Sequence, residues 1–183
     1  MRVLLLVLAW CGQDLRDAGR ELCKTIARLP ARRVTVVAHS MGGLVLLACL
    51  QQGAPTVRKV IFAGTPFAGS PKIFPDFVRG DRAGRNRALL SPEALFTFAS
   101  AFQLLPAAPD FIVGARESPF SPAFWTERGL GVFADPARRT DEGYLTHLRR
   151  MLAAHDELVS RAVHSKLLDD HDVQQAIAAA ASE

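Results

Sequence analysis

Short apolar runs alternate with amphipathic stretches over the first third of the chain. Residues 3–9 form an uninterrupted apolar run, typical of a parallel strand that is covered on both faces. Apolar residues then recur at spacings of three and four from Leu15 to Leu29, which predicts a helix with one buried face that ends at Pro30. The short β-branched run 34–38 predicts a second buried strand.

The same alternation continues as far as residue 62. Residues 42–52 predict a helix that is apolar nearly all round, since few polar positions interrupt it. Gly53 and Pro55 are expected to end this helix. Residues 57–62 predict a third strand. A strand–helix–strand–helix–strand order implies right-handed crossovers and a parallel sheet, so we expect an α/β fold.

The pattern changes after Ala63. Residues 64–139 are rich in Pro, Gly, Phe and Arg, and we expect one clear helical piece among them, from Ser91 to Leu105. Ser91 and Pro92 are typical residues at a helix start. A second amphipathic helix is expected from Thr140 onward. The apolar positions of the two helices are Leu95, Phe96, Phe98 and Phe102 in the first and Leu145, Leu148, Leu152 and Val159 in the second.

Composition and charge place the chain among globular proteins. Its 183 residues are 49% hydrophobic and 22% charged, with a net charge of +4, which is too weakly basic to indicate a nucleic-acid partner. One dense basic stretch is an exception. It is either a solvated loop or a contact with anionic lipid headgroups, and it consists of Arg79, Arg82, Arg85 and Arg87.

The cysteines and the N-terminus favour a reducing, cytoplasmic setting by default. Cys11, Cys23 and Cys49 are odd in number and show no metal or disulfide spacing, so we expect free thiols, with Cys49 buried in an apolar helix. The apolar N-terminal run is short for a signal peptide, and bulky Trp10 before Cys11 argues against a lipoprotein cleavage site. No run is long enough to span a bilayer.

One serine lies in a setting that favours nucleophilic chemistry. Ser40 falls between the predicted strand 34–38 and the predicted helix 42–52. A serine nucleophile must project from a sharp strand-to-helix turn, and small residues two positions away, here Ala38 and Gly42, relieve the crowding there. The backbone N–H of Met41 is then a natural oxyanion donor. The alternative interpretation is an ordinary Ser/Gly turn without chemistry.

Three segments resemble the lecithin:cholesterol acyltransferase family of lipid acyltransferases and phospholipases. They are His-Ser-Met-Gly-Gly-Leu-Val at 39–45, Gly-Thr-Pro-Phe-Ala-Gly-Ser-Pro-Lys at 64–72 and Gln-Leu-Leu-Pro at 103–106. The resemblance implies a partial α/β-hydrolase fold, with a parallel sheet, a nucleophile elbow and a helical cap. We expect the core segment at 1–66, the cap at 67–165 and a helical tail at 166–183.

The resemblance also implies an activity and a class of partner. Ser40 would attack the ester carbonyl of a lipid, and the resulting acyl-enzyme would pass its acyl group to a hydroxyl or to water. No cofactor, metal or nucleic acid is expected, and peripheral contact with a lipid surface is possible. Four phenylalanines of the cap would either face acyl chains or simply pack with one another. They are Phe96, Phe98, Phe102 and Phe124.

The acid and the base of a catalytic triad are left unassigned by the sequence. In this fold the order along the chain is serine, then Asp or Glu, then His. Residues of these types do follow Ser40, but their settings are helical and charged, and His155 shares a face with Leu148 and Leu152, where packing is expected. Trp10 has no assigned role. The unassigned groups are His147, His155, His164, His171, Asp156, Asp169, Asp170 and Asp172.

Two hypotheses about function therefore remain. In the first, the chain is a serine-dependent lipid acyltransferase or esterase that uses Ser40. In the second, it is a truncated, catalytically silent remnant that binds a lipid or a partner. A nucleotide-binding domain is a distant third, since the chain has neither G-x-G-x-x-G nor a phosphate-binding loop.

Overall fold

The fold was analysed in a computed structural model that describes residues 2–8, 12–30, 33–53, 57–81, 88–106 and 117–164. The chain divides into two compact units. The α/β unit contains Leu15–Phe67 together with the strand that precedes it, and the helical unit contains Ala68–Glu157 together with Gly12. Each unit is described by itself below.

The α/β unit is built on a parallel sheet of three strands. These are β1 (Arg2–Leu8), β2 (Arg33–His39) and β3 (Val57–Ala63), in the spatial order β1-β2-β3. The predicted strands and their parallel arrangement are thus confirmed. At the carboxyl end of the sheet, His39 of β2 pairs with Ala63 of β3, so the loops that follow these two strands leave from the same edge.

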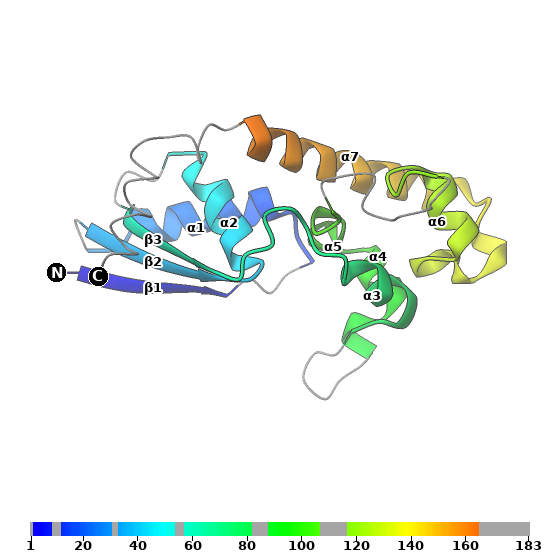
Figure 1. The fold of residues 1–183 in the computed structure, drawn as a ribbon, viewed down its shortest axis with the longest axis horizontal. Coiled ribbons are helices and arrows are strands. Elements are labelled where there is room, and N and C mark those ends of the chain that lie inside the picture. Colours follow the sequence, from blue (N-terminus) through cyan, green and yellow to red (C-terminus); the bar gives the residue numbers. More distant parts are fainter. Residues whose placement is uncertain are drawn as a thin grey trace. The chain divides into compact units, whose positions relative to one another are not determined.

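Two helices cover one face of this sheet, as Figure 1 shows. They are α1 (Leu15–Ala27) and α2 (Gly42–Leu50), close to their predicted bounds. Alternate side chains of β2 point toward them, because successive residues of a strand face opposite sides. This core contains Ile26 of α1, Leu46 of α2 and, from β2, Val34, Val36 and Ala38, all almost fully buried.

A disulfide joins the two helices and corrects the expectation of free thiols. Cys23 of α1 and Cys49 of α2 are bonded, with their Cα atoms 5.3 Å apart. Cys49 is fully buried, as predicted. The pairing arises because α1 packs against α2, a tertiary contact that the spacing of 26 residues does not reveal. Cys11 lies outside the described residues.

The helical unit holds several helices that the sequence pattern did not reveal, besides the piece expected from Ser91 to Leu105. Most of them are shorter than two turns, and a run of five to seven residues shows too little periodicity to be recognised in a sequence. In chain order the elements are α3 (Ile73–Arg79), η1 (Ala88–Leu90), α4 (Pro92–Phe96), α5 (Ala99–Gln103), α6 (Pro122–Arg128), η3 (Gly131–Ala134), η4 (Pro136–Arg138) and α7 (Glu142–His164).

The single helix expected from Ser91 to Leu105 is wrong, because the chain breaks between α4 and α5. Thr97 ends α4, and its hydroxyl donates to the carbonyl of Ala94. Phe98 is extended, with φ of −94° and ψ of 111°. The next amide, that of Ala99, donates to the carbonyl of Gly12 at 3.0 Å. A hydrogen bond distant in sequence therefore replaces a helical one.

Aromatic side chains form the core of the helical unit. The rings of Phe77 and Trp125 are 4.7 Å apart, and Phe102 lies 5.0 Å from each of them. Such contacts stabilise by about 0.5–1.5 kcal/mol per pair beyond the burial of area. Phe96 and Phe124 are buried in the same cluster and Phe98 is half-buried. All four phenylalanines therefore pack within the helical unit.

The long helix α7 closes this core. Asp141 caps it, because its carboxylate accepts from the amides of Gly143 and Tyr144 at 2.8 and 3.2 Å. The predicted apolar face is confirmed at Leu148 and Leu152, which are buried, whereas the side chain of Val159 lies outside the described part. Within the described residues, no helix combines the length and the apolar character needed to cross a bilayer.

Candidate active site at the end of strand β2

The backbone turns sharply at Ser40, directly after β2. Ser40 has φ of 53°, and among the described residues it is the only residue other than glycine with a positive φ. A side chain in this left-handed region costs roughly 1–2 kcal/mol. Strain of this kind persists only where the surrounding structure enforces it. The α/β unit therefore holds Ser40 in an unfavourable conformation, with the residue exposed to solvent.

Hydrogen bonds on both sides fix this conformation. The amide of Ser40 donates to the carbonyl of Ala63, at the end of β3, at 2.9 Å. Its own carbonyl accepts from the amide of Gly43 at 3.0 Å. Because one bond ties the turn to the neighbouring strand and the other to the start of α2, the serine has little freedom to relax.

Helix α2 starts directly after Ser40. Met41 occupies the N-cap position, without a side-chain cap, and its carbonyl accepts from the amides of Leu44 and Val45. Within the described part of the chain, the amides of Met41 and Gly42 have no hydrogen-bond acceptor. Free amides at a helix start, together with the helix dipole, favour negative charge. The strand–turn–helix thus places Ser40 directly before a helix start whose first amides have no acceptor among the described residues.

Small residues on either side make this geometry possible. Ala38 is fully buried between the sheet and the helices, and Gly42 is buried at the first turn of α2. A larger side chain at either position would meet a packed interior, where an added methylene group costs about 1–3 kcal/mol. The sequence argument for a small residue on each side of Ser40 agrees with this burial.

Thr65 also lies against the start of α2. A Cβ atom placed on Gly43 would lie 2.7 Å from the Cβ of Thr65, so only glycine lets the loop after β3 approach the helix this closely. The Thr65 hydroxyl is buried and has no hydrogen-bond partner among the described residues. The sequence pattern assigned no role to Thr65, although this residue lies in the Gly-Thr-Pro segment. Its position, two residues after the end of β3, is the signal that could have indicated it.

Two histidines have partners inside the helical unit. Nε2 of His147 lies 2.9 Å from the carbonyl oxygen of Phe96. His155 is buried, and its ring stacks on Phe120 at 4.9 Å, which agrees with the packing expected from its helix face. Burial lowers the pKa of His155, although the charge of Asp156 and the carbonyl of Phe102 oppose the shift. Both rings therefore have structural roles in their own unit.

Most of the other residues considered from the sequence lie outside the described part of the chain. His171, Asp169, Asp170 and Asp172 lie outside the described residues, as do Trp10 and three arginines of the basic stretch, Arg82, Arg85 and Arg87. The side chain of His164 is likewise not described. Among the residues that are described, no cluster of His, Cys, Asp or Glu could hold a metal ion. Of the predicted nucleophile and oxyanion donor, Ser40 and Met41, the structure describes both, as consecutive residues of the turn between β2 and α2.

The chain is similar to known proteins in sequence and in fold. A sequence model described as lecithin:cholesterol acyltransferase matches residues 20–176. An uncharacterized protein of Saccharomyces cerevisiae, YJR098C, is 34% identical over 73 residues, which are 40% of this chain and 11% of the yeast protein. The crystal structure of the Tle4–Tli4 complex contains a chain with a similar fold, at a TM-score of 0.59 and 18% identity, over 84% of this chain and 42% of that chain.

Proposed function

The chain belongs to the lecithin:cholesterol acyltransferase family, and from this we propose that it performs acyl-ester chemistry on lipids through an acyl-enzyme on Ser40. The chain spans 11% of the yeast relative and 42% of the solved neighbour, so the proposal concerns the residues present here. In it, the strand–turn–helix at Ser40 is the nucleophile elbow of an α/β-hydrolase fold, and the helical unit is the cap.

One observation supports this assignment above the others, the positive φ of Ser40. An ordinary Ser/Gly turn would use glycine in the left-handed region, because glycine adopts it without a steric penalty. The glycines here follow at positions 42 and 43, and the strained residue is the serine itself. Retaining a serine where glycine is more stable favours a role for its hydroxyl.

The proposed reaction has two half-steps. The Ser40 oxygen bonds to the ester carbonyl carbon as a base removes its proton, and the carbonyl oxygen becomes an oxyanion that accepts a hydrogen bond from the Met41 amide. Collapse breaks the ester bond, and the departing alcohol takes up a proton. A hydroxyl or water then attacks the acyl-enzyme, releases the acyl group and returns the proton to Ser40.

Turnover of a chromogenic ester tests this proposal. We expect the purified chain to hydrolyse p-nitrophenyl decanoate. The rate of the Ser40→Ala variant should be at least about 10³-fold lower, because the nucleophile acts as a unit with its base. Ser118→Ala is the matched control, since Ser118 is also exposed and should leave the rate unchanged. Adding a long-chain alcohol separates transfer from hydrolysis, because transfer yields its decanoate ester.

A specific observation supports the second candidate, a lipid-binding protein without turnover. His147 and His155 both have contacts inside the helical unit, a hydrogen-bond contact with the Phe96 carbonyl for His147 and a ring stack on Phe120 for His155, which favours packing roles over that of a catalytic base. Folded protein that binds a lipid ester equally well with and without Ser40, and never releases p-nitrophenol, would establish this candidate and overturn the first.

A further inference from the structure

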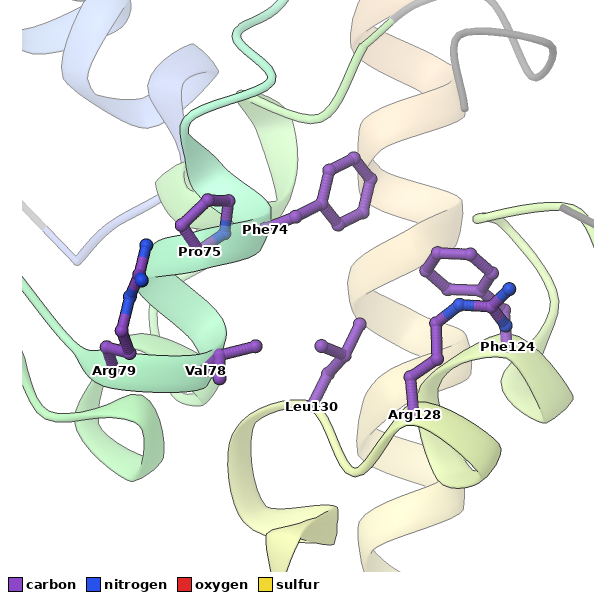
Figure 2. A pocket seen from close by; sticks show the side chains of 7 residues that line it. All are labelled: Phe74, Pro75, Val78, Arg79, Phe124, Arg128 and Leu130. Atoms are coloured by element: carbon purple, nitrogen blue, oxygen red, sulfur yellow. The ribbon is translucent and has the colours of Figure 1, made fainter. Parts of the chain in front are cut away.

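The helical unit contains an open pocket between α3 and α6. It has a volume of about 290 Å³, and Figure 2 shows its walls. Helix α3 supplies one wall and α6 the other, with Leu130 between them. All of these residues belong to the helical unit. The lining residues are Phe74, Pro75, Val78, Arg79, Phe124, Arg128 and Leu130.

Most of the pocket surface is apolar and already in place. Phe124 and Leu130 are almost fully buried, and the rings of Phe74 and Phe124 meet edge to face at 5.8 Å. Val78, by contrast, is 55% exposed and points across the pocket in Figure 2. A large apolar side chain left in solvent beside a preformed apolar floor indicates a surface that a hydrocarbon group can cover.

The ends of α6 hold the opposite wall in position. Ser121 caps the start of the helix, with its hydroxyl accepting from the amide of Phe124 at 3.3 Å. Gly129 ends it in the left-handed conformation, with φ of 61°, which turns the chain and brings Leu130 to the floor. A pocket whose walls are fixed before binding loses little entropy when a ligand enters.

Two arginines give the pocket its charge. The guanidinium of Arg128 lies 4.2 Å from the centre of the Phe124 ring, which keeps the cation at the pocket wall. Arg79 lies at the other edge, beside Pro75 (Figure 2). Among the described residues no carboxylate pairs with either arginine, and no lining residue is acidic. An anionic group at the rim would therefore meet unpaired cations.

We propose that this pocket binds a single-chain anionic amphiphile, a long-chain carboxylate. Its hydrocarbon tail would cover Phe74, Val78 and Leu130, and its carboxylate would form charge-assisted hydrogen bonds with Arg79 or Arg128. The volume favours one chain over two, because small-molecule pockets run from about 300 to 1,000 Å³ and this pocket lies at the lower limit. The proposal does not depend on the chemistry proposed for Ser40.

Calorimetric titration with dodecanoate below its micellar concentration tests the site. We expect saturable binding, and binding at least about tenfold weaker in Val78→Glu, because a carboxylate in the pocket repels the ligand and loses its own hydration on binding. Leu89→Glu is the matched control, since Leu89 is also 55% exposed but does not line the pocket; its affinity should stay within about twofold of the parent.

A second arm tests the charge. Dodecyltrimethylammonium has the same chain and the opposite charge, so it should bind at least about tenfold more weakly than dodecanoate. The double variant Arg79→Gln, Arg128→Gln should remove this preference, whereas Arg149→Gln, on α7, should retain it.

Three results would overturn the proposal. The first is no binding of dodecanoate by folded protein, and the second is equal affinity in Val78→Glu. The third is equal affinity for dodecanoate and dodecyltrimethylammonium. Where dodecanoate does not bind but phosphatidylglycerol vesicles do, this face is a membrane contact rather than a ligand site.

Discussion

The conformation of Ser40 has a cost that stability measurements can detect. The turn holds this residue at φ of 53°, where a side chain is strained and glycine is not. We predict that Ser40→Gly unfolds with a free energy about 1 kcal/mol higher than Ser40→Ala, although both variants lack the hydroxyl. Urea denaturation of the two proteins measures the difference.

A control substitution in a helix should reverse the sign of this difference in unfolding free energy between glycine and alanine. Ala153 is exposed in the middle of α7, where glycine should destabilise by about 0.5–1 kcal/mol relative to alanine. If Ser40→Gly were less stable than Ser40→Ala, the left-handed conformation at this residue would be contradicted.

Buried His155 makes stability depend on pH. Burial lowers its pKa below the ordinary value of 6.5, so the folded state binds a proton less readily than the unfolded state. The stabilisation from neutral His155 is complete above pH 6.5 and is lost as the pH falls from 6.5 through the lowered pKa. We predict that the free energy of unfolding falls over this window, and that His155→Leu makes the fall shallower.

Urea denaturation at a series of pH values measures this slope. His147→Gln is the control, because it removes a histidine from the same helix and leaves the buried one in place. A slope that is the same in the parent protein and in His155→Leu would assign the pH dependence to other groups.

At the scale of elements, the start of α2 and the loop after β3 should be coupled. A methyl group on Gly43 would meet the side chain of Thr65. We predict that Gly43→Ala destabilises by about 1–3 kcal/mol, and that Thr65→Gly in the same chain, which also removes the Cβ atom of residue 65, recovers part of this loss. A double-mutant cycle measured by thermal unfolding gives the coupling energy. Strictly additive effects would show that the two side chains do not meet.

The disulfide between α1 and α2 is the second coupling between elements. It closes a loop with a sequence separation of 26, for which the loss of entropy in the unfolded chain corresponds to roughly 3–4 kcal/mol. We predict that dithiothreitol lowers the melting temperature, and that it has no further effect on the Cys23→Ala, Cys49→Ala double variant. An unchanged melting temperature in the parent protein after reduction would contradict a structural bond.

At the scale of the whole molecule, periodicity predicted the α/β unit and missed much of the helical unit. The strands and helices up to Ala63 are long, strongly apolar and in a simple order, so their pattern carries the fold. Helices such as α3 and α6 are seven residues long, and their positions depend on aromatic contacts across the chain. The break at Phe98 and the Cys23–Cys49 bond likewise follow from tertiary contacts.

The candidate site divides in the same way. Ser40 and Met41 were predictable because the chemistry of a nucleophile imposes small neighbours and a strand-to-helix turn on adjacent residues. Thr65 and the pocket at Val78 were not, because each depends on segments that are distant in sequence and meet only in the folded chain. Constraints on adjacent residues can be recognised in a sequence, whereas contacts between segments that are distant in the chain cannot.

Covalent labelling tests the central claim, that Ser40 is an activated nucleophile, most directly. A long-chain fluorophosphonate forms a bond from phosphorus to a reactive serine oxygen and releases fluoride. Mass spectrometry detects the resulting phosphonyl adduct and assigns it to a peptide. We predict one adduct, on the peptide that contains Ser40, which is absent from Ser40→Ala and retained in Ser118→Ala. Folded protein that takes up no phosphonyl group, or takes it up at another serine, would contradict the assignment.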